Sequence, residues 1–157
     1  APTWQPELGP AAVLGAGGAA RAVVASLLDV GVPEIFISNR TRIRAEALQS
    51  EFGKRLTVVD WVQAGNMLEE ATTVVNTTSL GMLGKPPLPL DGLRRGALVT
   101  DLVYAPLKTQ FLIEAEKMGC VTVDGLGMLL HQAVPAFERW FGVRPNVDSA
   151  TRAAVLR

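Results

Sequence analysis

The stretch Ala11-Ala12-Val13-Leu14-Gly15-Ala16-Gly17-Gly18-Ala19-Ala20 places an apolar run directly before a glycine-rich loop. The loop has the pattern G-x-G-x-x-A, and the Ala- and Leu-rich segment that follows predicts a helix. In such a unit Gly15 permits the tight turn, Gly17 lets the backbone approach a pyrophosphate, and Ala20 keeps the helix close to the strand. Free amides at the start of that helix favour an anion, although a purely structural turn is the alternative. The residues expected to contact a nucleotide here are Gly15, Ala16, Gly17, Gly18 and Ala19.

Short apolar or β-branched runs alternate with segments of helical period along the rest of the chain. This alternation is typical of βαβ units with a parallel sheet. It predicts a Rossmann-like, doubly wound α/β fold in three α/β/α layers, with strand order 3-2-1-4-5-6. The six expected strands cover residues 11–14, 34–39, 56–60, 73–76, 97–102 and 121–124.

The two ends of the chain carry further expectations. The segment 1–10 contains three prolines and no initiator Met, so we expect a linker there and a chain excised from a longer protein, with one domain over 11–157. Near the other end, an apolar stripe is expected on a helix that Pro135 should kink or divide. A short amphipathic series at Val147, Ala150 and Ala154 is expected to pack back on the domain. The members of the stripe are Leu130, Ala133, Phe137, Trp140 and Phe141.

Composition excludes several classes of function. The 157 residues include 15 basic and 15 acidic ones, so the net charge offers no footprint for nucleic acid or an anionic membrane. No apolar run is long enough to span a bilayer, and we expect a soluble cytoplasmic protein. Cys120 is the single cysteine and His131 the single histidine, which excludes a disulfide framework and predicts no metal site. Cys120 is interpreted as a small core residue. Nothing in the sequence pairs His131 with an acid, so a role in proton transfer is not expected.

The end of the second expected strand carries the cofactor preference. NAD enzymes usually place an acid there, whereas this chain has Asn39-Arg40-Thr41-Arg42-Ile43-Arg44. Guanidinium groups form charge-assisted bonds to phosphate, and basic residues at a helix start oppose the helix dipole unless they have another role. The pattern predicts recognition of a 2′-phosphate, and therefore NADP(H), by Asn39, Arg40, Thr41 and Arg44, with Arg42 facing solvent; a capped, solvated helix start is the alternative.

With these motifs in place, the chain resembles the C-terminal, NADP-binding domain of shikimate dehydrogenases from Ala11 to Pro145. Further matching segments are Asn76-Thr77-Thr78-Ser79-Leu80-Gly81-Met82, Asp101-Leu102-Val103-Tyr104 with Pro106 and Thr109, and Asp124-Gly125-Leu126-Gly127-Met128-Leu129 leading to Gln132 and Ala133. The resemblance implies that Tyr104 and Gln132 reach the substrate. It also implies that Gly125 and Met128 flank the nicotinamide. The full set of cofactor contacts that it implies is Asn76, Thr77, Thr78, Ser79, Met82, Leu102, Gly125 and Met128.

The resemblance also implies what this chain lacks. The family reduces 3-dehydroshikimate to shikimate with NADPH, in aromatic amino-acid biosynthesis, through a Lys and an Asp that belong to an N-terminal substrate domain. Lys108 and Asp101 match cofactor-domain positions instead, so no catalytic residue is expected here. We therefore expect the isolated chain to bind cofactor without turnover, and the missing substrate domain to be its partner in binding shikimate.

Three alternatives remain. A quinate/shikimate dehydrogenase relative would share these motifs, because its substrate choice depends on residues mostly outside this chain. A glutamyl-tRNA reductase has a similar glycine loop, but the segments from Asp101 and from Gly125 argue against it. The third is a non-catalytic NADP-binding module that senses cofactor or binds a partner.

Overall fold

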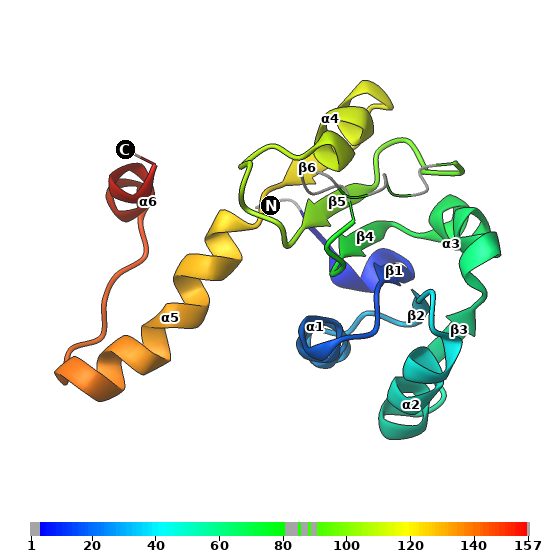
Figure 1. Ribbon diagram of the computed structural model, residues 1–157, viewed down its shortest axis with the longest axis horizontal. Coiled ribbons are helices and arrows are strands. Elements are labelled where there is room, and N and C mark those ends of the chain that lie inside the picture. Colours follow the sequence, from blue (N-terminus) through cyan, green and yellow to red (C-terminus); the bar gives the residue numbers. More distant parts are fainter. Residues whose placement is uncertain (1–3, 81–84, 86–87, 89–90, 157) are drawn as a thin grey trace.

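A computed structural model describes residues 4–80, 85, 88 and 91–156. Within this part of the chain, parallel strands form a single sheet in the order β3-β2-β1-β4-β5-β6, which confirms the predicted order and the doubly wound fold (Figure 1). Several predicted strands extend one residue beyond the observed strand at one or both ends, because the backbone there no longer forms the hydrogen bonds of the sheet. The strands are β1 (Ala11–Leu14), β2 (Ile35–Ser38), β3 (Leu56–Val59), β4 (Thr73–Asn76), β5 (Leu98–Asp101) and β6 (Val121–Val123).

Helices cover both faces of the sheet and give the predicted three layers. On one face, α1 (Gly18–Asp29) and α2 (Arg42–Phe52) pack over β1, β2 and β3. On the other, α3 (Ala64–Glu70) and α4 (Gln110–Lys117) bury a second cluster against β1, β4 and β5. In α1 the buried residues Ala20, Val24 and Leu27 recur at helical spacing, which explains why this segment is a helix.

The register of the strands brings their carboxyl ends to one level. Leu14 lies opposite Ser38 on one side and Asn76 on the other, and Asn76 in turn lies opposite Asp101. The loops that follow β1, β2, β4 and β5 therefore leave the sheet at the same edge. In open parallel sheets ligands bind at this edge, next to the point where the strand order reverses.

Two short 3-10 helices join this framework, η1 (Pro6–Leu8) and η2 (Trp61–Gln63). In the expected linker, the indole N–H of Trp4 donates to the Thr73 hydroxyl at 2.9 Å, and the ring packs against the cluster under α1. The segment before β1 thus contacts the domain. Its assignment as a linker up to residue 10 stays a prediction.

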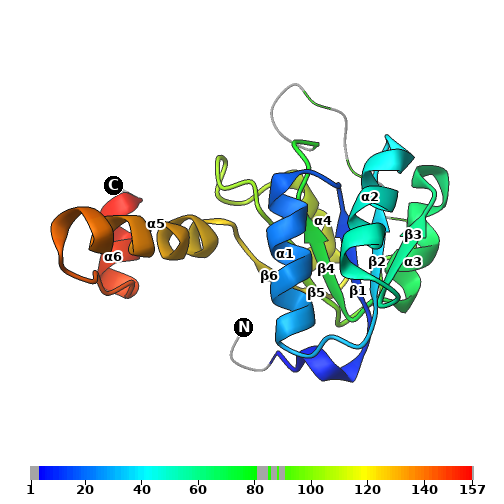
Figure 2. The same ribbon diagram turned by 90° about the horizontal axis from the view of Figure 1, so that it is seen from below.

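Two C-terminal helices project from the sheet (Figures 1 and 2). The helix α5 (Leu126–Phe141) runs through Pro135 as one element, so a division at this proline was wrong; helix bonds on either side of the missing N–H hold the segment together. Its apolar stripe is largely exposed: Trp140 is 75% and Phe141 64% accessible.

The helix α6 (Ser149–Val155) contacts α5. Val147 is half-buried and lines a hollow with Val134 and Pro135, but Ala150 and Ala154 are exposed, so the packing expected of these two residues was wrong. Their methyl groups offer little area to bury, and an ion pair from Arg152 to Asp124 makes the attachment instead. None of the helices within the described ranges is both long and apolar enough to cross a membrane.

Candidate dinucleotide-binding site

The glycine loop turns sharply from β1 into α1. Gly15 has φ +105°, and a Cβ there would lie 2.6 Å from the Thr77 hydroxyl, so only glycine fits. Its N–H donates to the Ser38 carbonyl at 2.8 Å. By contrast, a Cβ on Gly17 or Gly18 would meet no atom within 4 Å. The start of α1 therefore presents open space in front of backbone N–H groups, as an anion site requires.

A hollow of about 190 Å³ lies in front of this loop. The loops after β1, β2, β3 and β4 all contribute to its walls, as the common level of the strand ends predicts. Most of the lining was predicted from the sequence, but Trp61 was not assigned to the site, and Leu80 was only part of a matching segment. The lining residues are Gly15, Ala16, Gly17, Asn39, Arg40, Trp61, Thr77, Thr78, Ser79 and Leu80.

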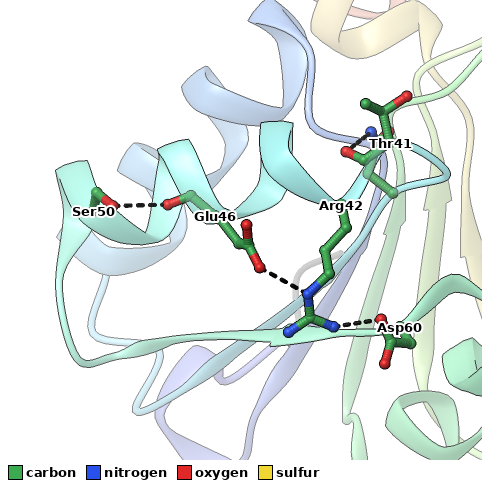
Figure 3. Close-up of polar contacts among 6 residues, drawn as sticks. Thr41, Arg42, Glu46, Ser50 and Asp60 are labelled. Carbon is green, nitrogen blue, oxygen red and sulfur yellow. Dashed lines mark hydrogen bonds and ion pairs between the residues drawn. The ribbon is translucent and has the colours of Figure 1, made fainter.

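The three arginines after β2 differ in their partners. Arg42 donates to Glu46 at 2.7 Å and also pairs with Asp60, and these hydrogen bonds raise its pKa further above the ordinary value (Figure 3). Arg40 and Arg44 are exposed, and neither has an ion pair within the described residues. Arg42 is thus half exposed but already neutralised, which leaves Arg40 and Arg44 available for an anion.

Asn39 and Thr41 shape the turn that carries these arginines. The Asn39 side-chain amide donates to the Thr41 carbonyl at 2.8 Å. Thr41 is the N-cap residue of α2, but its hydroxyl accepts no capping hydrogen bond. Asn39 reaches the hollow, whereas Thr41 and Arg44 lie on the exposed start of α2 beside it.

Buried polar groups fix the loop after β4. Asn76 is fully buried; its amide donates to Asp101 at 2.9 Å, and its oxygen accepts from the Thr78 N–H and hydroxyl. The Thr77 hydroxyl donates to the Leu14 carbonyl at 2.7 Å. The side chain of Asn76 therefore points into this network rather than into the hollow, and it acts on the site by holding Thr78.

Asp101 anchors the other side of the same network. Its carboxylate accepts from the Thr109 hydroxyl at 2.7 Å and from the Val103 N–H at 3.0 Å, besides the Asn76 amide. Burial raises the pKa of Asp101, and these hydrogen bonds oppose the rise. Each oxygen is thus committed to the loops that shape the site.

A second hollow of about 370 Å³ adjoins the first, because both are lined by Thr77, Thr78 and Ser79. Its remaining walls come from residues 102–105 after β5, including Leu102 and the half-exposed Tyr104. Together the two hollows extend along the carboxyl edge from the end of β2 to the end of β5.

The site residues expected on and before α5 lie only partly at the two hollows. A Cβ on Gly125 would lie 2.7 Å from the Leu102 carbonyl, so this glycine allows α5 to begin directly against β5. Met128 and the exposed Gln132 line neither hollow. Met82 lies outside the described residues.

Several chemically active side chains lie elsewhere. Lys108 forms an ion pair with Glu116 at 2.5 Å, and exposed His131 lines a separate hollow beside Pro135. Cys120 is half-buried, and burial raises the pKa of its thiol. The described part of the chain holds no cluster of three metal-ligating side chains.

One polar atom near the site lacks a partner. The Ser38 hydroxyl at the end of β2 is fully buried and is the buried side-chain polar atom without a hydrogen bond among the described residues. Such orphaned groups are rare in folded proteins and are often satisfied by a water or a ligand. The sequence offered no sign of this, because burial of a strand-end hydroxyl depends on the neighbouring loops.

The parallel sheet, the glycine turn and the paired hollows define a Rossmann-type dinucleotide-binding domain. The family model for shikimate/quinate 5-dehydrogenase matches residues 8–82, and that for the shikimate 5′-dehydrogenase C-terminal domain matches residues 125–155. The chain belongs to the shikimate dehydrogenase family and corresponds to its C-terminal part.

Relatives of known name and structure agree with this assignment. The chain is 70% identical over 99% of its length to a shikimate dehydrogenase (NADP(+)) of Cereibacter sphaeroides, of which it covers 57%. A quinate dehydrogenase from Corynebacterium glutamicum in complex with NAD has a TM-score of 0.86 at 33% identity, covering 99% of this chain and 56% of its own. Shikimate 5-dehydrogenase of Thermus thermophilus in complex with NADP(H) and shikimate has a TM-score of 0.76 at 42% identity. The match covers 88% of this chain and 51% of the Thermus thermophilus chain. The chain thus spans a little over half the length of these relatives.

Proposed function

We propose that this chain is the NADP(H)-binding part of a shikimate dehydrogenase, the whole of which reduces 3-dehydroshikimate to shikimate in aromatic amino-acid biosynthesis. The observation that carries the proposal is the 70% identity, over 99% of the chain, to a protein named shikimate dehydrogenase (NADP(+)). Because the chain spans 57% of that relative, the proposal for this chain is cofactor binding and one wall of the active site.

The residues at the carboxyl edge fit a phosphorylated dinucleotide. Open space before Gly17 and Gly18 admits a pyrophosphate at the start of α1. Arg40 and Arg44 carry unneutralised charge beside the end of β2, where the adenosine ribose of a dinucleotide lies in this fold. The orphaned Ser38 hydroxyl sits at the same strand end. These features support NADP(H) over NAD(H), because a 2′-phosphate gives the two arginines a partner.

The second hollow is the proposed place of the nicotinamide and the substrate. When bound, NADPH supplies a hydride; the chain's part is to orient the ring and exclude water through the walls around Thr78 and Leu102, with Gly125 next to Leu102. Tyr104, which lines this hollow and is half-exposed, is proposed to contact the substrate through its hydroxyl. Met128 and Gln132 are proposed to complete the site from α5, and Met82 from the loop after β4.

The proton for the reaction is proposed to come from a separate substrate domain. Lys108 is committed to Glu116, and His131 lies at another hollow, so neither is placed to serve. That domain would correspond to the part of the relatives that this chain does not span. The exposed aromatic face of α5, with Phe137, Trp140 and Phe141, is proposed to pack against it.

Two alternatives are left for the experiment to separate. A quinate dehydrogenase relative would share the likeness to the Corynebacterium glutamicum enzyme, but that structure is in complex with NAD, whereas the arginines after β2 of this chain are proposed to bind a 2′-phosphate. A non-catalytic NADP-binding module would also use the first hollow. Under each alternative we expect a cytoplasmic protein, which stays a prediction.

The test is to titrate NADPH and NADH into the chain and then to assay NADP⁺ reduction with shikimate and with quinate. We expect tighter binding of NADPH, no turnover by the chain alone, and shikimate oxidation once a separately expressed substrate domain from a relative is added. Absence of NADPH binding would overturn the proposal. Binding with turnover of quinate alone would favour the first alternative, and binding without any turnover in the presence of the added domain the second.

A further inference from the structure

We propose that Trp61 forms a wall of the adenine subsite and stacks on the adenine base of the cofactor. The inference rests on the proposed function and deepens it by naming the group that recognises the base. Trp61 lines the same hollow of about 190 Å³ as Gly17 and Arg40. A tryptophan facing open space between a phosphate-binding loop and an unpaired arginine is placed to hold an aromatic ring with an attached phosphate.

The strand register explains why Trp61 reaches this position. Ser38, the last residue of β2, lies opposite Val59, the last residue of β3, in a parallel pair. Two residues beyond these ends, Arg40 and Trp61 therefore leave the sheet side by side. In this fold the adenosine half of a dinucleotide lies over the end of β2. Trp61, two residues after β3, is then the neighbour of the base rather than of the nicotinamide.

The indole is anchored on one side and open on another. Trp61 is half-buried and packs against the apolar cluster beneath α3, which includes Leu14, Leu68 and Leu80. Trp61 also lines the hollow, so part of its surface is open to a ligand. An aromatic face held in this way binds the π-face of a base at low entropic cost. The guanidinium of Arg40 at the same hollow can add a cation–π contact to the base.

An ion-pair network holds the backbone before Trp61 in place. Arg42 joins Glu46 of α2 to Asp60, the residue that precedes Trp61 (Figure 3). The Asp60 carbonyl also accepts from the Gln63 N–H at 2.8 Å and closes the turn of η2. The start of α2 and the end of β3 are thereby tied together. This gives Arg42 a role that needs no contact with the 2′-phosphate, since it keeps Trp61 beside Arg40.

The test uses adenosine 2′,5′-bisphosphate, which carries the base and the 2′-phosphate but no nicotinamide. Its affinity is measured by calorimetry for wild type, Trp61→Leu and Trp61→Phe, with Trp140→Leu on exposed α5 as the matched control. We expect Trp61→Leu to weaken binding on the order of 5- to 100-fold, and NADPH binding by the same factor. Trp61→Phe should retain most of the affinity, and Trp140→Leu all of it.

Tryptophan fluorescence separates stacking from a merely structural effect. Adenosine 2′,5′-bisphosphate should change the emission of wild type, and the change should disappear in Trp61→Phe although Trp4 and Trp140 remain. Unaltered affinity in Trp61→Leu, or an emission change that persists in Trp61→Phe, would overturn the stacking while leaving NADP(H) binding intact. Failure of wild type to bind either ligand would instead remove the proposed function itself.

Discussion

Asn76 and Asp101, the last residues of β4 and β5, lie opposite each other in register and are joined by a buried hydrogen bond of 2.9 Å. Asn76 also holds the Thr78 N–H and hydroxyl, and Asp101 holds the Thr109 hydroxyl. The pair therefore couples the loop shared by both hollows to the start of α4. We therefore expect stability and ligand binding to depend on the same few polar atoms.

Replacing Asn76 by Ala should damage both properties. The change removes a hydrogen bond to a buried carboxylate and leaves Thr78 without its acceptor. We expect the free energy of unfolding to fall by about 1 to 3 kcal/mol, with weaker NADPH binding. Urea unfolding and a cofactor titration measure the two effects. The matched control is Asn146→Ala, whose amide contacts Asp148 at 3.3 Å on the surface and should change little. Equal stability of the two variants would contradict the prediction.

The raised pKa of Asp101 sets a pH dependence with a definite sign. Burial makes the native state take up a proton at a higher pH than the unfolded chain, whose Asp pKa is about 3.9. Between these two pKa values the native state binds more protons, so the contribution of Asp101 to stability is present at low pH and is lost as the pH rises through the window.

Comparison with Asp101→Asn isolates this contribution, because other titrating groups are common to both proteins. As the pH is lowered from about 7 to about 4, the free energy of unfolding of wild type should rise relative to that of the variant. Urea unfolding at a series of pH values gives this difference. A difference that stays constant or moves the opposite way would show that hydrogen bonding, not burial, controls the carboxyl.

Two glycines of the same loop should respond differently to alanine. At Gly17 the backbone is extended with φ −98° and a Cβ meets no protein atom, so Gly17→Ala should keep the stability and lose cofactor affinity. At Gly15, φ is +105° and Thr77 is in the way, so Gly15→Ala should destabilise the fold by about 1 to 3 kcal/mol or more. Thermal unfolding and NADPH titration of both variants check this. Unchanged affinity in a stable Gly17→Ala protein would remove the pyrophosphate from this loop.

The sheet could be predicted because short apolar runs alternate with segments of helical period. The first strand, the glycine loop and α1 form a local unit, and a right-handed crossover leaves few orders for the remaining strands. The exposed stripe of α5 could not be foreseen in the same way. Its period predicts a helix with an apolar face, but what covers that face depends on a contact outside the segment. Pro135 misled because a helix of sixteen residues can lose one bond and continue.

The site was harder to predict residue by residue. Asn76 and Thr78 are both polar and both follow a strand, yet only the structure shows that Asn76 turns inward to Asp101. Trp61 is part of no motif; the usable signal was its position two residues after β3, at the level of Arg40 two residues after β2. Arg42 differs from Arg40 and Arg44 because it pairs with Asp60, which is eighteen residues away in the sequence. No local sequence pattern predicts that pairing.

The attachment of α6 should depend on one ion pair. Arg152 binds both oxygens of Asp124, at 3.1 and 2.5 Å, and α6 has no fully buried residue to hold it otherwise. In Arg152→Ala we expect faster amide hydrogen exchange in α6 with β1 and β4 unchanged. Arg139→Ala, at the exposed end of α5, is the control. Equal protection of α6 in both variants would show that its contacts with α5 suffice.

The choice between NADPH and NADH should depend on Arg40 and Arg44 and not on Arg42. Each charge-assisted bond to the 2′-phosphate contributes about 1.5 to 3 kcal/mol, so Arg40→Ala and Arg44→Ala should each lower NADPH affinity roughly 10- to 100-fold. NADH affinity should change far less, because that cofactor lacks the phosphate. Arg42→Ala is the matched control: its cation is already shared by Glu46 and Asp60, so the ratio of the two affinities should stay near that of wild type. Titration of both cofactors into the three variants gives these ratios. If Arg42→Ala alone lowered the ratio, the 2′-phosphate would bind at Arg42 rather than at Arg40 and Arg44, and the proposed phosphate site would be wrong.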